Sequence, residues 1–177
     1  MADLAKLKSM LRSIPDFPKK GIMFQDIFPI FLDPLAVEML VTHITHHITS
    51  SLGKVDVVVG LDARGFLIGP TIAMRIGAAF VPVRKQGKLP GATRSVGYEK
   101  EYGTDFFEMQ EDSIKPGQSV LILDDLIATG GSAKAAGELV KLFGGKVIEY
   151  LFFIELTALK GSSKLDAPIY SLMKFDD

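Results

Sequence analysis

The chain has 177 residues, and 47% of them are hydrophobic, which is enough apolar material for one domain with a substantial core. Twenty lysines and arginines stand against 21 aspartates and glutamates, so a net charge of −1 gives no general attraction for nucleic acid. Without cysteine, disulfides and cysteine-based zinc sites are excluded. With a charged N-terminus and no apolar membrane span, the composition predicts a cytoplasmic protein with a single domain over residues 1–177.

The first 34 residues predict a short helix followed by an extended, ordered arm. Residues 3–12 have an amphipathic pattern, and residues 15–34 contain four prolines, which disfavour a regular element. Asp33 followed by Pro34 is typical of a helix N-terminus. A helix is then predicted from the apolar residues that recur at helical spacing, namely Val37, Leu40, Val41, Ile44 and Ile48.

From residue 55 onward, strand patterns alternate with helix patterns. The predicted strands cover residues 55–59, 79–83, 120–123 and 147–154, and the predicted helices cover 66–76 and 132–143. This alternation predicts the α/β class, with a central, mainly parallel sheet flanked by helices. Ligands of such sheets bind beyond the carboxyl ends of the strands. The polar turns after Val59 and after Leu123 are therefore candidate site segments.

Residues 86–112 break this rhythm and predict a flexible lid. The segment is rich in glycine and charge, and 95–98 and 104–110 could pair as a hairpin around 99–101. The apolar Phe106, Phe107 and Met109 argue against disorder. A long polar insertion in a compact domain is often a lid or a binding loop.

The segment Val120–Ser132 carries the strongest functional signal. An apolar strand leads into Asp124 and Asp125, then into Thr129-Gly130-Gly131-Ser132 and a helix start. Glycines allow close approach of a ligand, and the free N–H groups and dipole of a helix N-terminus bind phosphate. The two acids would instead accept hydrogen bonds from hydroxyls, or hold a metal. Together these groups suit a ribose 5-phosphate.

Other readings of the same residues are weaker. Two acids after a strand are often a solvated strand end, and Thr-Gly-Gly is often a simple turn, but their order before a helix favours a site. The segment is neither a Walker A loop nor a dinucleotide fingerprint. His43, His46 and His47 lack the spacing of a His-Glu-x-x-His metal motif, and we expect them on a partly exposed helix face.

Six segments together resemble the type I phosphoribosyltransferases. They are Val120–Ser132, residues 15–18 with 21–27, 60–66, 84–91, 101–103 and 155–161. The first matches the family's signature for phosphoribosyl pyrophosphate (PRPP), and the others are similar to its adenine-specific members. The resemblance implies the family's fold, with an N-terminal base-binding arm (1–34) and a hairpin lid (86–112). It also implies transfer of a phosphoribosyl group from PRPP to adenine in purine salvage, giving AMP and pyrophosphate, with Mg²⁺ and as a homodimer.

The resemblance also assigns residues to each part of the substrates. The groups implied for the ribose and its 5-phosphate are Asp124, Asp125, Ala128, Thr129, Gly130, Gly131 and Ser132. Those implied for pyrophosphate are Asp62, Ala63, Arg64, Gly65, Arg84, Lys85, Lys88 and Tyr102. Those implied for adenine are Met23, Phe24, Gln25 and Leu126, with Phe24 and Leu126 packing on the ring. Glu101 is implied as the general acid or base, the 62–63 peptide as cis, and Mg²⁺ as held mainly by PRPP and water without a protein metal site.

The match is least complete in the arm, and two alternatives stay open. The family usually has arginine where Gln25 stands and a smaller residue where Met23 stands; recognition of the base by backbone groups would survive both changes. Glu101 and the pair Arg84-Lys85 could otherwise be ordinary solvated charges. The alternative functions are transfer to another base and a PRPP-sensing regulator of the same fold, although a regulator would need a nucleic-acid surface that this chain lacks.

Overall fold

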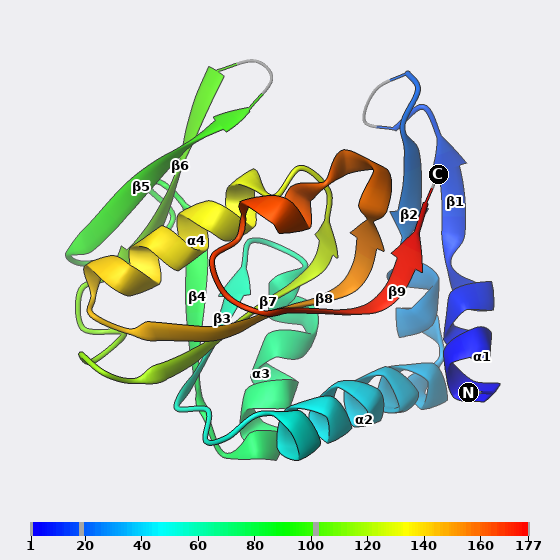
Figure 1. Cartoon of the computed structure of the whole chain (residues 1–177), viewed down its shortest axis with the longest axis horizontal. Helices are drawn as coiled ribbons and strands as arrows, with labels where there is room; N and C mark the ends of the chain where they lie inside the picture. Colours follow the sequence, from blue (N-terminus) through cyan, green and yellow to red (C-terminus); the bar gives the residue numbers. More distant parts are fainter. Residues whose placement is uncertain (1, 18–19, 101–102, 177) are drawn as a thin grey trace.

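The structure is a computed structural model that describes residues 2–17, 20–100 and 103–176. Its centre is a seven-stranded sheet in the order β5-β6-β4-β3-β7-β8-β9 (Figure 1). The strands are β3 (Val57–Leu61), β4 (Ala79–Lys85), β5 (Thr93–Lys100), β6 (Gly103–Gln110), β7 (Ser119–Ile127), β8 (Lys146–Leu156) and β9 (Ile169–Phe175). In this spatial order, the neighbouring strands β4, β3, β7, β8 and β9 are parallel to one another, whereas β6 is antiparallel to both β4 and β5. The predicted α/β fold with a mainly parallel sheet is confirmed.

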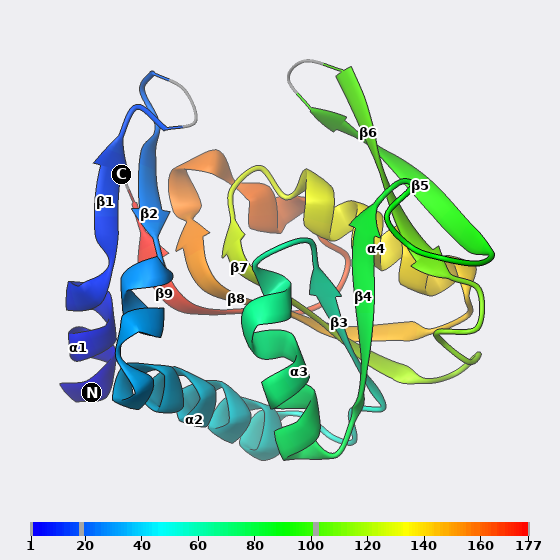
Figure 2. The ribbon, with the colours of Figure 1, turned by 180° about the vertical axis from the view of Figure 1, so that it is seen from behind.

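Helices cover both faces of the sheet. The helices α2 (Pro34–Ser51) and α3 (Gly65–Ile76) lie on one face, and α4 (Gly131–Leu142) lies on the other (Figures 1 and 2). Because alternate residues of a strand face opposite sides, each buried strand contributes side chains to the hydrophobic cores on both faces of the sheet. Leu121 and Leu123 pack with α2 and α3, whereas Val120 and Ile122 pack with α4.

The arm is more regular than its prolines predict. It consists of α1 (Ala2–Met10), β1 (Arg12–Pro15), β2 (Met23–Asp26) and the 3₁₀ helix η1 (Phe28–Leu32). The prediction of an arm without regular elements was wrong, because β1 and β2 pair antiparallel from Arg12–Asp26 to Pro15–Met23. Pro15 is tolerated at the end of an edge strand, where its missing N–H removes no sheet hydrogen bond. The predicted cap of α2 is confirmed, since Asp33 accepts from the Leu35 N–H at 2.9 Å.

The predicted hairpin is confirmed. Strands β5 and β6 pair from Thr93–Gln110 to Lys100–Gly103. Phe107 and Met109 are buried in the core beneath α4, which explains why the segment is ordered. The hairpins β1–β2 and β5–β6 stand at opposite ends of the sheet and project to the same side (Figure 1).

One predicted boundary near the candidate site was wrong, and one segment had not been predicted. Strand β7 does not end at Leu123 but continues to Ile127, because β8 pairs with it from Ser119–Lys146 to Ile127–Glu155. The chain beyond β8 was not predicted; it forms the short 3₁₀ helices η2 (Thr157–Leu159) and η3 (Gly161–Lys164) and then strand β9. Within the described residues, no helix combines the length and hydrophobicity needed to cross a membrane.

Candidate active site

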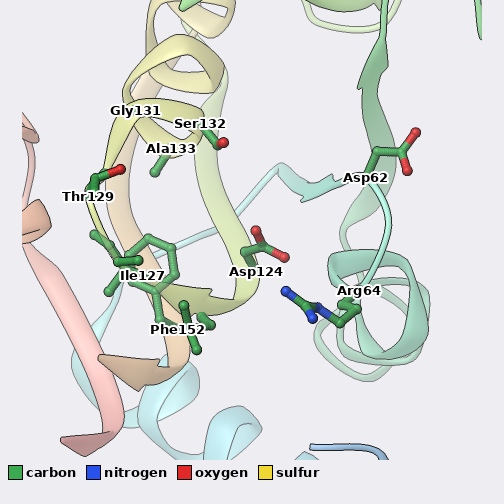
Figure 3. Close-up of a pocket in the computed structure, with 12 residues that line it drawn as sticks. Asp62, Arg64, Asp124, Ile127, Thr129, Gly131, Ser132, Ala133 and Phe152 are labelled. Atoms are coloured by element: carbon green, nitrogen blue, oxygen red, sulfur yellow. The ribbon is translucent and has the colours of Figure 1, made fainter. Parts of the chain in front are cut away.

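The topology of the sheet opens a crevice between β3 and β7. After β3 the chain moves to β4 on one side, and after β7 it moves to β8 on the other. Loops that leave neighbouring parallel strands in opposite directions form the usual ligand site of such sheets. A cavity of about 220 Å³ lies here (Figure 3). It is lined by Asp62, Arg64, Asp124, Leu126, Ile127, Ala128, Thr129, Gly130, Gly131, Ser132, Ala133 and Phe152.

One wall of the cavity is the N-terminus of α4, together with the turn that precedes it. We call residues 128–132 the phosphate cup. Gly130 is the N-cap, with a φ of +78° that a side chain would disfavour. The first intrahelical hydrogen bond recorded there runs from Lys134 N–H to Gly130 C=O at 3.0 Å. The N–H groups of the first helical turn are therefore open to an anion, as the helix dipole favours.

The two acids of β7 differ in their surroundings. Asp124 lines the cavity, whereas Asp125 is only 2% exposed and its Oδ2 lies 2.7 Å from Nε of Arg64. Neighbouring side chains of a strand face opposite sides, so the two carboxylates cannot do the same work. Oδ1 of Asp124 also accepts from the Asp125 N–H at 2.9 Å. Figure 3 shows the side chains of Asp124 and Arg64 pointing toward each other, on the side of the cavity opposite residues 129–133.

The acids are held in a setting that opposes their ionisation. Burial raises the pKa of Asp124 well above its usual range, and the neighbouring charge of Asp125 adds to this effect. Burial also raises the pKa of Asp125, although Arg64 acts in the opposite direction. Perturbed carboxyl groups in a crevice are typical of a functional site.

The loop after β3 forms the opposite wall. The Asp62–Ala63 peptide is cis, as the resemblance implied. Gly65 is required for close approach, because a Cβ there would lie 2.8 Å from the Leu123 carbonyl oxygen. The Asp62 carboxylate pairs with Arg84, whose Nε lies 3.0 Å from Oδ2.

A buried carboxylate that the sequence analysis missed shapes the loop after β4. Glu108 of β6 accepts from the N–H groups of Lys88 at 2.9 Å and Leu89 at 2.8 Å, and from the Thr93 hydroxyl at 3.3 Å. Burial acts to raise the pKa of Glu108, but these donors outweigh it, and the pKa is lowered. Arg84 also donates to the Lys88 carbonyl at 3.2 Å. The only hint in the sequence is one charge within the apolar run 106–109.

One aromatic ring of the arm lies beside Arg64, a residue that lines the cavity. The guanidinium carbon of Arg64 lies 5.2 Å from the centroid of Phe24, and Phe17 packs edge-on against Phe24 at 5.0 Å. Gln25 is 3% exposed, and its Oε1 accepts from the Ser13 hydroxyl at 3.0 Å, so this side chain braces the hairpin. Met23 is partly exposed.

Nine of the twenty predicted site residues line the cavity, namely Asp62, Arg64, Asp124, Leu126 and the five residues of the phosphate cup. Leu126 lines the cavity with the cup and the 62–64 loop, and Ile127, Ala133 and Phe152 are lining residues that were not predicted. Lys85 and Lys88 are exposed beyond the cavity, and Lys85 lies 3.9 Å from Asp105. Glu101 and Tyr102 lie outside the described residues. Among the described residues, no group of three or more histidines and acids is placed to hold a metal.

Of the three histidines, His47 has a structural contact that was not expected. Its Nε2 lies 2.8 Å from Oε1 of Glu149, and its ring stacks on Tyr170 with centroids 3.5 Å apart. Burial raises the pKa of Glu149, while His47 acts to lower it. This cluster joins α2 to β8 and β9 and takes no part in the cavity.

Comparison with known proteins supports an assignment to one family. A family model described as the phosphoribosyl transferase domain matches residues 30–175. The adenine phosphoribosyltransferase of Yarrowia lipolytica is 58% identical over 170 residues, which cover 95% of this chain and 93% of the relative. The adenine phosphoribosyltransferase of Caenorhabditis elegans is 50% identical over 172 residues, which cover 97% of this chain and 93% of the relative. A crystal structure of the Saccharomyces cerevisiae enzyme with adenine and an imino-altritol bisphosphate superposes with a TM-score of 0.95 at 48% identity, covering 97% and 99%.

Proposed function

Because this chain belongs to the adenine phosphoribosyltransferases and forms AMP and pyrophosphate from adenine and PRPP in purine salvage, we propose which residues carry each part of that reaction. The observation that carries the proposal is the open N-terminus of α4 beside Asp124, at the switch point of the sheet. It offers a phosphate site and a hydroxyl acceptor within one cavity. PRPP presents a phosphate and a diol in that order.

The phosphate cup holds the 5-phosphate, and Asp124 of β7 holds the ribose. Ala128, Thr129, Gly130, Gly131 and Ser132 supply N–H groups and hydroxyls to the phosphate oxygens. Asp124 accepts from the ribose hydroxyls. Asp125, through its contact with Arg64, fixes the strand end and the first residues of α3.

The chemical step moves the anomeric carbon from pyrophosphate to adenine. The C1–O bond to pyrophosphate breaks, the bond to adenine N9 forms, and positive charge builds on the ribose ring during the exchange. A carboxylate beside the ring stabilises that charge, which is the work of Asp124. Adenine reacts as the tautomer that carries its proton on N7, so that N9 attacks with a free lone pair, and Glu101, on the lid between β5 and β6, accepts the N7 proton as the bond forms. Closure of the lid excludes water from the reactive centre.

Pyrophosphate leaves toward the basic side of the crevice. Its contacts are the backbone of Asp62, Ala63 and Gly65, the side chains of Arg64, Arg84, Lys85 and Lys88, and Tyr102. Asp62 and Glu108 support this role, since they position Arg84 and the Lys88 loop before substrate arrives. Mg²⁺ would be held mainly by PRPP and water, since it prefers phosphate and water ligands, and Asp124 and Asp62 are the carboxylates that line the cavity near it. When bound, Mg²⁺ neutralises charge on the pyrophosphate.

Adenine lies between Phe24 and Leu126 and is recognised by backbone groups of Met23 and Gln25. Residues in an antiparallel pair alternate between exchanging hydrogen bonds and facing outward. Pro15, opposite Met23, has no N–H, which favours hydrogen-bonded pairing at Ile14–Phe24. The N–H and C=O groups of Met23 and Gln25 then face outward and are available to the base.

The test is product formation with single bases. The protein is incubated with PRPP, MgCl₂ and adenine, hypoxanthine, guanine, xanthine or orotate, and nucleotides are separated by chromatography. AMP from adenine alone, formed much more slowly by Asp124→Asn and, at low adenine concentration, by Phe24→Ala, supports the residue assignment. AMP formation at the parent rate in both variants would overturn it, whereas a product from another base would point to the alternative transferase.

Three further features belong to the same proposal. Residues 1–177 form one domain, supported by a single sheet with cores on both faces. The protein is a cytoplasmic homodimer, supported by exposed apolar side chains such as Leu32, Leu35 and Met74. Light scattering after gel filtration measures its mass, and a value near 19 kDa would exclude the dimer.

A further inference from the structure

The segment between β8 and β9 packs directly behind the phosphate cup. Gly161, the first residue of η3, is buried against the backbone of Ala128, Thr129 and Gly130. A Cβ on Gly161 would lie 2.7 Å from the Gly130 nitrogen and 2.8 Å from the Thr129 carbonyl carbon, and closer still to the Ala128 oxygen. A Cβ on Gly130 would in turn meet the backbone of Gly161. The two backbones are therefore in contact with no room for a methyl group.

Contacts on both sides of Gly161 hold its segment in place against the phosphate cup. The Thr157 hydroxyl donates to the Phe175 carbonyl at 3.0 Å, which ties η2 to the end of β9. Glu155, a buried carboxylate of β8, lies 3.5 Å from the Lys174 ammonium of β9, and the nearby Ser162 hydroxyl acts to lower the pKa of Glu155. With anchors on both sides of Gly161, an added methyl group would displace the cup as well as the segment.

Phosphate binding depends on the backbone conformation of the cup. Phosphate binding at a helix N-terminus needs several N–H groups that converge on one point, so small displacements are costly. Gly130 already holds a φ of +78° immediately before α4. Contact from behind is what keeps Ala128 and Thr129 in the path that leads into this turn.

We propose that Gly161 is a positioning residue for the 5-phosphate of PRPP: it supports the phosphate cup from behind, and its lack of a side chain sets the shape of the cup. This inference rests on the proposed role of residues 128–132. It assigns a function to the η2–η3 segment, which does not line the cavity itself.

The test compares Gly161→Ala with Gly53→Ala. A Cβ on Gly53 would have nothing within 4 Å, and neither glycine has a positive φ, so the two changes differ in the steric contact alone. Affinities for AMP and for pyrophosphate with MgCl₂ are measured by calorimetry, and kcat and KM for PRPP by steady-state assay. Gly161→Ala should weaken AMP binding and raise KM for PRPP on the order of 10- to 100-fold, with pyrophosphate affinity unchanged. Gly53→Ala should match the parent protein in both affinities, in kcat and in KM for PRPP.

Two results would overturn the inference. One is AMP binding by Gly161→Ala equal to that of Gly53→Ala. The other is an equal loss of AMP and pyrophosphate affinity, which would indicate general damage. If Gly161→Ala does not fold, Ser162→Ala loosens the anchor without adding atoms; it should weaken AMP several-fold more than pyrophosphate, and no such difference also overturns the inference.

The proposed role of the cup is tested separately with the double variant Thr129→Ala/Ser132→Ala. Loss of AMP affinity in this variant while Gly161→Ala binds normally would refute the role of Gly161 alone. Normal AMP affinity in the double variant would refute the cup as the 5-phosphate site.

Discussion

Replacing Asp124 by asparagine should stabilise the protein while it suppresses the reaction. Burial and the charge of Asp125 raise the pKa of Asp124 well above its usual range in the folded protein. The unfolded chain therefore releases this proton at lower pH than the folded protein does. Above the unfolded pKa, folding must oppose the ionisation of Asp124, and stability falls as pH rises toward the folded pKa.

Each unit by which folding raises the pKa costs about 1.4 kcal/mol at high pH. Asparagine cannot ionise, and its Oδ1 can still accept from the Asp125 N–H, so the substitution removes the cost and keeps the hydrogen bond. We expect Asp124→Asn to raise the free energy of unfolding at pH 8, and each 1 kcal/mol gained would appear as roughly 2–4 °C in Tm for a chain of this length. The loss of a carboxylate beside the developing charge should lower kcat on the order of 100-fold.

The assay is thermal unfolding at pH 4 and pH 8, with steady-state kinetics at pH 8. The gain in Tm should be present at pH 8 and small at pH 4, where Asp124 is protonated in the parent protein. The exposed Asp112 serves as the matched control, and Asp112→Asn should change neither Tm nor kcat. A Tm gain that is equal at both pH values, or absent at pH 8, would refute the electrostatic argument.

Three other substitutions test separate parts of the account. Glu108→Ala leaves the N–H groups of the Lys88 loop without their acceptor and should raise KM for PRPP about tenfold in steady-state assays. Glu108→Gln keeps an acceptor oxygen, so its KM for PRPP should stay within about threefold of the parent value. Equal effects of the two variants would contradict the role of this oxygen. His47→Ala leaves the buried Glu149 without its partner and should cost about 1–3 kcal/mol in urea unfolding with kcat unchanged; a change in kcat would link this cluster to the active site. Phe24→Ala should raise KM for adenine at least tenfold and leave KM for PRPP within about twofold, and a larger effect on PRPP would speak against stacking on adenine.

The sequence predicts best where one continuous segment contains all the parts of a feature. The segment 120–132 holds a strand, two acids, a glycine turn and a helix start in order, and its physics indicates a ribose phosphate before any fold is known. Alternating strands and helices likewise predict the parallel sheet. The strand boundary at Leu123 was misplaced because residues 124–127 pair with residues of β8 that lie 28 positions further along the chain.

The features that were missed depend on contacts between distant segments. Glu108 matters because its carboxylate meets the 88–89 backbone, and Gly161 matters because it meets the 128–130 backbone. Neither contact leaves a local pattern. The arm was predicted as irregular because prolines suppress the strand signal, although the pairing of β1 with β2 tolerates Pro15 at its end.

A crystal structure of the protein with AMP tests the central claim most directly. The account predicts that the 5-phosphate binds in the phosphate cup, residues 128–132, that the ribose hydroxyls bind Asp124, and that adenine lies between Phe24 and Leu126. A phosphate bound instead at Arg84 and Lys88, with the ribose away from Asp124, would contradict it.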